Sequence, residues 1–214
     1  MTIADSRPAA ALASAEARGA VPPVLHPLLA ERWSPTTFDS SYHVTASDVD
    51  AILEAARWAP SAGNSQPWAF ITGRRSDPIH ARLARHLTGS SAAWAPSASL
   101  LVANLCHRYV EDTDDWEYSE FAHYDLGQAV AHMTFQAQAM GLYARQFRAF
   151  NRTALAEEFA VPNHWEVTTM TAFGRRPRGL QDIPVPTSSE ERPQRHRRSG
   201  REIQWMPFDG TSRD

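Results

Sequence analysis

The run APSAGNSQPW, residues 59–68, gathers hydroxyl, amide and glycine groups into one short stretch. Small side chains and backbone N–H groups of this kind can approach a bound ligand closely, so the chemistry they suggest is binding by hydrogen bonds. Pro60 and Pro67 restrict the backbone at the two ends of the run. Taken alone, however, the run is more simply an ordinary connection from a helix to a strand.

Arginine supplies every cationic side chain apart from histidine, since all 21 Lys and Arg positions are Arg. Schiff-base chemistry, lysine-anchored phosphate loops and lysine general bases are therefore excluded. A phosphate would have to be bound by Arg forks, helix ends or backbone N–H groups. No Gly-x-Gly-x-x-Gly run follows a predicted strand, so a Rossmann-type dinucleotide site is not predicted.

The thiol and imidazole groups favour structural roles. Cys106 is the single cysteine, which excludes an intrachain disulfide and a cysteine cage for a metal. It lies in SLLVANLC, a predicted buried strand, where a thiol is more often core filler than nucleophile. The nine histidines include no His-x-x-x-His pair, so no metal site is predicted.

A helix and a strand are predicted on either side of the APSAGNSQPW loop. Apolar residues recur at helical spacing in SDVDAILEAARW, residues 47–58, with Thr45 or Ser47 as the cap and Pro60 as the stop. The next run, WAFIT at 68–72, predicts a strand. The loop is thus expected to be held by regular structure at both ends.

The remaining elements alternate between helix and strand without a strict parallel rhythm. Helices are predicted over 25–32, over 78–87, from Asp125 to a stop at Gly141, and over 152–159 with Asn151 as the cap. Strands are predicted over 99–106, 143–147 and 166–173. The predicted fold class is therefore α+β.

Length and composition predict one domain with two arms. The 214 residues, 43% of them hydrophobic, carry a formal charge of −3 and can bury one sizeable core. No apolar run approaches the roughly 20 residues that cross a bilayer, so no membrane partner is expected. Residues 1–24 lack a signal-peptide pattern and predict a disordered or loosely packed arm, 25–180 the domain, and 181–214 a polar C-terminal arm. A cytoplasmic location fits the single cysteine best.

Two separated motifs together resemble the nitroreductase family of flavoproteins. ERWSPTTFD, residues 31–39, matches the family's Arg-x-Ser-x-Arg start, and APSAGNSQPW matches its Ala-Pro-Ser-x-x-Asn-x-Gln-Pro-Trp loop. Weaker pieces follow in the family's order, so that the resemblance covers about residues 25–205. It implies a central, mostly antiparallel sheet flanked by helices. It also implies an extended C-terminal arm that wraps a partner subunit and completes the flavin site.

The resemblance implies that FMN binds at the interface of a homodimer. One subunit would contribute Arg32, Trp33, Ser34 and Thr36 near the phosphate and the flavin edge, with Arg195 and Arg197 on the phosphate. The other subunit would contribute Pro60, Ser61, Ala62, Asn64 and Gln66. The backbone of Arg148 and Ala149 would lie near flavin N5, where hydride enters. Over the flavin, a substrate pocket would be lined by Trp116, Tyr118, Phe121 and Tyr124, although an aromatic-rich start to a helix explains these four equally well.

The implied function is an FMN-dependent oxidoreductase that takes hydride from NADH or NADPH. It would reduce a nitroaromatic, a quinone or a similar flat acceptor in ping-pong fashion, and no acid–base side chain is required because the cofactor carries the chemistry. Thr36 replaces the family's second basic residue, which leaves open a flavin-binding or flavin-sequestering protein with little turnover. A dimeric interaction module without cofactor is the third hypothesis. Arg195 and Arg197 also fit a solvated basic tail, but the overall acidity argues against a nucleic-acid partner.

Overall fold

The computed structural model describes residues 25–113, 115–177 and 197–205. By internal contacts the chain divides into two compact units, 1–178 and 179–214, which are described separately here. The predicted arm over residues 1–24 lies outside the described residues. The predicted domain boundaries after residues 24 and 180 stay predictions. Within the described residues, no helix is long and apolar enough to span a bilayer.

A four-stranded sheet forms the centre of the first unit. Its strands are β1 (Trp68–Arg74), β2 (Leu100–His107), β3 (Tyr143–Phe147) and β4 (Trp165–Gly174), in the order β1-β2-β4-β3. All three pairings are antiparallel, and the register shifts at Asn104 and Leu105. The predicted α+β class with a mostly antiparallel sheet is therefore confirmed.

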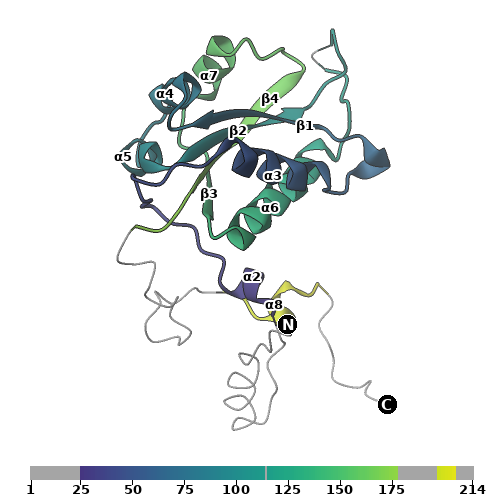
Figure 1. Ribbon diagram of the computed structural model, residues 1–214. Coiled ribbons are helices and arrows are strands. Elements are labelled where there is room, and N and C mark those ends of the chain that lie inside the picture. The colour runs from purple at the N-terminus through teal and green to yellow at the C-terminus, as the bar shows by residue number, and fades with distance from the viewer. Residues whose placement is uncertain (1–24, 114, 178–196, 206–214) are drawn as a thin grey trace, which may run out of the picture. The chain divides into compact units, whose positions relative to one another are not determined.

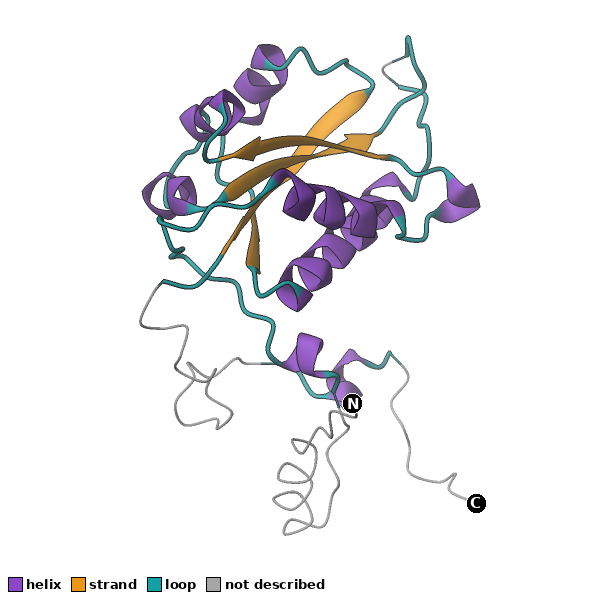
Figure 2. Ribbon diagram, viewed as in Figure 1, coloured by secondary structure: helices purple, strands orange, loops and turns teal. Residues whose placement is uncertain are grey.

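Helices cover both faces of this sheet (Figure 1, Figure 2). On one face α3 (Ala46–Arg57) and the long α6 (Ala122–Ala139) pack side by side. On the other face lie α4 (Pro78–Arg85), α5 (Ser91–Trp94) and α7 (Arg152–Glu158). Short elements complete the described chain: α2 (Pro27–Ala30), the 3-10 turns η1 (Ala62–Asn64) and η2 (Ala95–Ser97), and, in the second unit, α8 (Gly200–Ile203).

Capping residues set several helix ends as the sequence predicts. Thr45 caps α3 in a capping box, in which the Asp48 N–H donates to Thr45 Oγ1 at 3.1 Å and the Thr45 N–H donates to the Asp48 carboxylate at 2.8 Å. Asn151 caps α7 through its side-chain oxygen. Gly141, with φ of 76°, follows the end of α6. Helix α3 ends at Arg57, before the predicted stop at Pro60, because the chain turns at Trp58.

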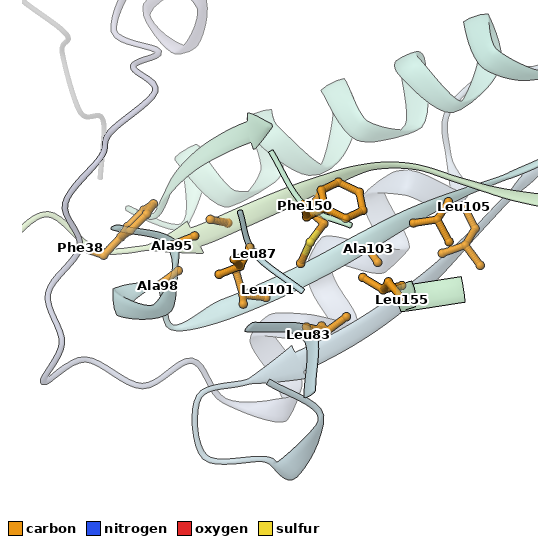
Figure 3. Close-up of a cluster of buried hydrophobic side chains, with 13 residues drawn as sticks. Phe38, Leu83, Leu87, Ala95, Ala98, Leu101, Ala103, Leu105, Phe150 and Leu155 are labelled. Carbon is orange, nitrogen blue, oxygen red and sulfur yellow. The ribbon is translucent and has the colours of Figure 1, made fainter. Parts of the chain in front are cut away.

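Side chains alternate in direction along each strand, so the hydrophobic core is divided between the two faces of the sheet. Leu101 and Ala103 of β2 face α4 and α7, where they pack with Leu83 and Leu155 (Figure 3). The neighbouring positions on β2 face α3 and α6 and pack in the cluster that contains Phe173. Because β2 is buried on both sides, it fixes the layer against which α6 is placed.

Candidate functional site

A cavity of about 600 Å³ lies between α6, the β4 and β3 strands, and the segment that precedes α3. Helix α6 lines it with Leu126, Gly127, Val130, Thr134 and Phe135 among others, and the sheet lines it with Gln146, Thr168 and Thr169. Arg32 and Ser34 also line it. The volume falls within the range of about 300 to 1,000 Å³ that is usual for ligand pockets. The cavity therefore joins an apolar helix face to guanidinium, hydroxyl and amide donors.

Two guanidinium groups converge on Ser34. Arg32 Nη1 donates to the Ser34 hydroxyl at 2.8 Å, and Arg145 Nη1, from β3, donates to the Ser34 carbonyl oxygen at 2.8 Å. Both residues line the cavity, and their predicted role in binding a cofactor stays a prediction. Trp33, between them, is 38% exposed and does not line the cavity. Thr36 is exposed.

The side chain of Gln146 joins the sheet to α6 inside the cavity. Gln146 Nε2 donates to Thr134 Oγ1 at 2.5 Å. The Thr134 hydroxyl in turn donates to the carbonyl oxygen of Val130 at 2.8 Å, one turn earlier in α6. This chain of hydrogen bonds fixes the spacing between the helix wall and the sheet wall of the cavity.

The predicted binding loop, residues 60–66, is anchored to the first turn of α6. Asp125, 2% exposed, accepts a hydrogen bond from the Ala62 N–H at 3.0 Å. The loop is also closed internally, since the Gln66 N–H donates to Ser61 Oγ at 3.1 Å. Its backbone includes three residues with positive φ: Gly63 at 58°, Asn64 at 56° and Gln66 at 46°. The loop therefore holds a defined shape, with Ala62, Gly63, Asn64 and Gln66 exposed.

The loop does not share the cavity with Arg32 within one chain. Of the described residues, those that line the cavity include Arg32 and Ser34 but none from 59–67. The two motifs therefore form separate surfaces of the first unit.

Comparisons with known proteins find similarity to one family. The nitroreductase family model matches residues 29–105, which hold both motifs. A Helicobacter pylori (strain J99) protein named oxygen-insensitive NADPH nitroreductase is 39% identical over 59 residues, which cover 28% of this chain and 28% of that protein. The chain thus matches little more than a quarter of that relative's length.

Solved structures extend the similarity over most of the chain. A structure described as an oxidoreductase containing FMN is 25% identical, with a TM-score of 0.68, and the match covers 82% of this chain and 83% of that one. A Desulfovibrio desulfuricans protein solved in complex with FMN is also 25% identical, with a TM-score of 0.64, covering 86% and 99%. This chain is thus similar to nitroreductase-family proteins in sequence over residues 29–105 and in fold over most of its length.

Arg148 and Ala149, which the resemblance places near flavin N5, follow directly after β3. Arg148 is exposed. The Ala149 carbonyl oxygen accepts from the Thr88 N–H at 3.0 Å and from the Ser91 hydroxyl. In the described part of the chain, the Ala149 N–H has no acceptor. The backbone here is therefore fixed through its carbonyl and keeps a donor available.

The four aromatic residues of the predicted substrate pocket lie at the surface before and at the start of α6. Their exposed fractions are 71% for Trp116, 38% for Tyr118, 47% for Phe121 and 69% for Tyr124, and none lines the cavity. Tyr118 donates its hydroxyl to the Ser65 carbonyl oxygen at 3.2 Å, which connects this segment to the binding loop. Their role over a flavin stays a prediction.

Two titratable groups beside this segment have shifted pKa values. His107 stacks on Tyr118 with ring centres 3.9 Å apart, and burial, followed by the charge of His164, lowers its pKa. Burial raises the pKa of the Cys106 thiol to about 12, so the thiol stays protonated and is not a nucleophile. Among the described residues, no group of three or more His, Cys, Asp and Glu side chains could hold a metal ion.

The two C-terminal arginines of the predicted phosphate site belong to the second unit. Arg195 lies outside the described residues, and Arg197 is exposed in the second unit, ahead of α8. Their predicted contact with a phosphate stays a prediction. Other residues of the site were not predicted from the sequence: Asp125 as the loop anchor, Thr134 and Gln146 at the cavity, and Arg145 as a donor to the Ser34 carbonyl oxygen. The signal available for Arg145 was its position in YARQF, a short strand with an unusual interior charge.

Proposed function

We propose that the chain is an FMN-dependent oxidoreductase that takes hydride from NADH or NADPH and reduces a nitroaromatic, a quinone or a similar flat acceptor. The observation that carries the proposal is the cavity along α6, where Arg32 and Ser34 meet an apolar helix face. An apolar wall suits a flat ring system, and a guanidinium suits a phosphate. The FMN-bound Desulfovibrio desulfuricans protein shares the fold and supports this choice of cofactor.

The donor set fits FMN because a phosphate needs charge-assisted donors and this chain has only Arg to supply them. Arg32 and Ser34 would bind the phosphate and Trp33 would lie against the flavin edge, with Arg195 and Arg197 closing on the phosphate. The free Ala149 N–H, beside Arg148, would donate to flavin N5. When bound, FMN would supply two-electron chemistry, and donor and acceptor would use the same face in turn.

The separation of the two motifs supports the proposal of a homodimer. The exposed loop with Pro60, Ser61, Ala62, Asn64 and Gln66 would meet the Arg32 segment of a second copy. A shallow groove between α3 and α6, which includes Ala55, Trp58 and Phe135, is suited to such a contact. Trp58 is 72% exposed in the single chain, which is unusual for a tryptophan that no partner covers. We place the dimer in the cytoplasm.

Cofactor identity provides the first test. The purified protein is expected to be yellow and to release FMN rather than FAD on denaturation, because the cavity offers donors for one terminal phosphate and the sequence holds no dinucleotide fingerprint. Mass spectrometry of the released cofactor gives the answer. Release of FAD, or no flavin after reconstitution with FMN, would contradict the proposal.

Oligomeric state provides the second test. A stable homodimer with a flavin site at its interface is expected to bury about 2,000 Å² or more. Light scattering of the flavin-loaded protein should therefore give twice the chain mass of 23.8 kDa. A flavin-loaded monomer would refute the two-subunit site.

A flavin-sequestering protein is the second candidate, favoured by the neutral Thr36. It would bind FMN as tightly, but NADH and NADPH would not bleach the flavin absorbance under anaerobic conditions. Bleaching, followed by recovery of colour on adding a quinone, selects the oxidoreductase.

A further inference from the structure

Thr169 of β4 forms part of the cavity wall and also belongs to a group of polar side chains inside the sheet. Its partner in the register with β2 is Asn104, which is fully buried. The Asn104 side-chain Nδ2 donates to Thr169 Oγ1 at 3.0 Å and to Thr171 Oγ1 at 2.9 Å. These three polar side chains lie on the sheet face that otherwise packs apolar residues against α6.

The hydrogen bonds of Asn104 determine how the Thr169 hydroxyl can act. Both Nδ2 hydrogens are used as donors, so Thr169 Oγ1 is an acceptor toward Asn104 and its own proton stays available. In this orientation the oxygen Asn104 Oδ1 is buried without a partner in the described part of the chain, which proteins tolerate more often for an oxygen than for an N–H group. Among the described residues, no acceptor for the Thr169 hydroxyl proton is present.

The two neighbouring threonines of β4 each differ from Thr169 in one respect. Thr168 also lines the cavity, but its hydroxyl donates to the Glu166 carbonyl oxygen at 3.3 Å. Thr171 has the same contact with Asn104, but it is fully buried and does not line the cavity. Of these three, Thr169 combines a place on the cavity wall with a hydroxyl proton that no described residue accepts. A donor at such a place is suited to an acceptor atom of a ligand.

The place of Thr169 along β4 limits what that ligand atom can be. Ser34 lies at the guanidinium end of the cavity and is held by Arg145, whose partner in the sheet is Ala172. Ala172 is three residues beyond Thr169, which is about 10 Å along a strand. The α6 wall of the cavity is lined mostly by apolar side chains. A neutral acceptor atom is therefore favoured over a phosphate at Thr169.

We propose that Thr169 donates a hydrogen bond to a carbonyl oxygen of the flavin ring. The assignment rests on the proposed FMN function, in which Arg32 and Ser34 bind the phosphate and the ring takes the rest of the cavity. The flavin ring is flat, has apolar faces and carries carbonyl oxygens at C2 and C4. It therefore matches an apolar wall that offers one isolated donor.

Thr169→Val tests the assignment, because it removes the hydroxyl and nearly keeps the shape of the side chain. FMN and riboflavin are both expected to bind this variant about three- to tenfold more weakly, which is the usual loss for one hydrogen bond to a neutral acceptor. An equal loss for the two flavins indicates a ring contact, since riboflavin lacks the phosphate. Thr169→Ser keeps the hydroxyl and should stay within about twofold of the parent. Fluorescence titration of the apoprotein gives the affinities.

Thr171→Val is the matched control, because it also removes one acceptor of Asn104 but changes no residue of the cavity wall. It should leave both flavin affinities within about twofold of the parent. Thr168→Val removes a hydroxyl from the same wall, and it should lose less affinity than Thr169→Val because that hydroxyl is already bonded to Glu166. Circular dichroism of each variant verifies that it is folded.

Vibrational spectroscopy adds a measurement that a general loss of packing would not change. A hydrogen bond lowers the stretching frequency of a carbonyl group, so the frequency of one flavin carbonyl should rise in Thr169→Val. Raman spectra of FMN isotopically labelled at C2 or at C4 identify which carbonyl it is. The Thr171→Val protein should give the frequencies of the parent.

Three outcomes would overturn the assignment of Thr169. The first is a flavin affinity of Thr169→Val within about twofold of the parent. The second is an equal loss in Thr171→Val, which would show that the Asn104 contact and not the ligand is responsible. The third is that neither flavin carbonyl changes frequency. In each case a parent protein that binds FMN leaves the proposed function standing, whereas a parent that binds no flavin contradicts that function itself.

Discussion

Replacing Arg32 by alanine is expected to weaken FMN binding about ten- to a hundredfold and to leave riboflavin binding nearly unchanged. The change removes a charge-assisted contact to the phosphate, which contributes roughly 1.5 to 3 kcal/mol. Riboflavin lacks the phosphate, so its affinity depends only on the ring and the ribityl chain. Fluorescence titration of the apoprotein with each flavin gives the two affinities.

Arg85→Ala is the matched control for this experiment, because Arg85 is an exposed cation of α4 on the opposite face of the sheet. Arg197→Ala should reproduce the Arg32→Ala pattern if the C-terminal arm closes on the phosphate. The double variant should then lose less than the sum of the two single losses, since the groups share one ligand. An FMN affinity within twofold of the parent for Arg197→Ala would identify a solvated tail instead.

Phe173→Ala is expected to lower the free energy of unfolding by about 3 to 5 kcal/mol. Phe173 is fully buried in β4, in the cluster formed with α3 and α6, and truncation leaves a cavity that this layer cannot fill. Urea denaturation followed by circular dichroism measures the loss. Phe121→Ala removes the same atoms from a residue that is 47% exposed and should change stability by no more than about 0.5 kcal/mol. Equal effects of the two changes would contradict the assigned core.

Helix ends that depend on nearby residues were predicted correctly from the sequence. Thr45 and Asn151 cap helices because a side-chain oxygen within three residues satisfies the first free N–H groups. Element boundaries were less accurate: α6 begins at Ala122, earlier than the predicted Asp125, and the short α5 was not predicted. A four-residue helix has too little periodicity to be recognised.

Strand order and the cavity could not be predicted from local patterns. Strand β4 pairs with both β2 and β3, and this choice depends on contacts between residues that are far apart in the chain. The site also depends on such distant contacts: the sequence motif predicted Arg32 and Ser34 as site residues, but it did not predict Arg145 or Gln146. Gln146 lines the cavity and Arg145 contacts Ser34 only because β3 takes the edge of the sheet beside Ser34.

The left-handed backbone of the binding loop has a consequence for the thermodynamics of association. Asn64 and Gln66 adopt positive φ in the single chain, a conformation that is uncommon outside glycine and costs free energy to maintain. The free energy of folding offsets this cost before any ligand binds, and the hydrogen bond from the Ala62 N–H to Asp125 contributes to it. A ligand that meets the loop therefore loses little affinity to the ordering entropy of a flexible segment, and association does not have to wait for a loop rearrangement.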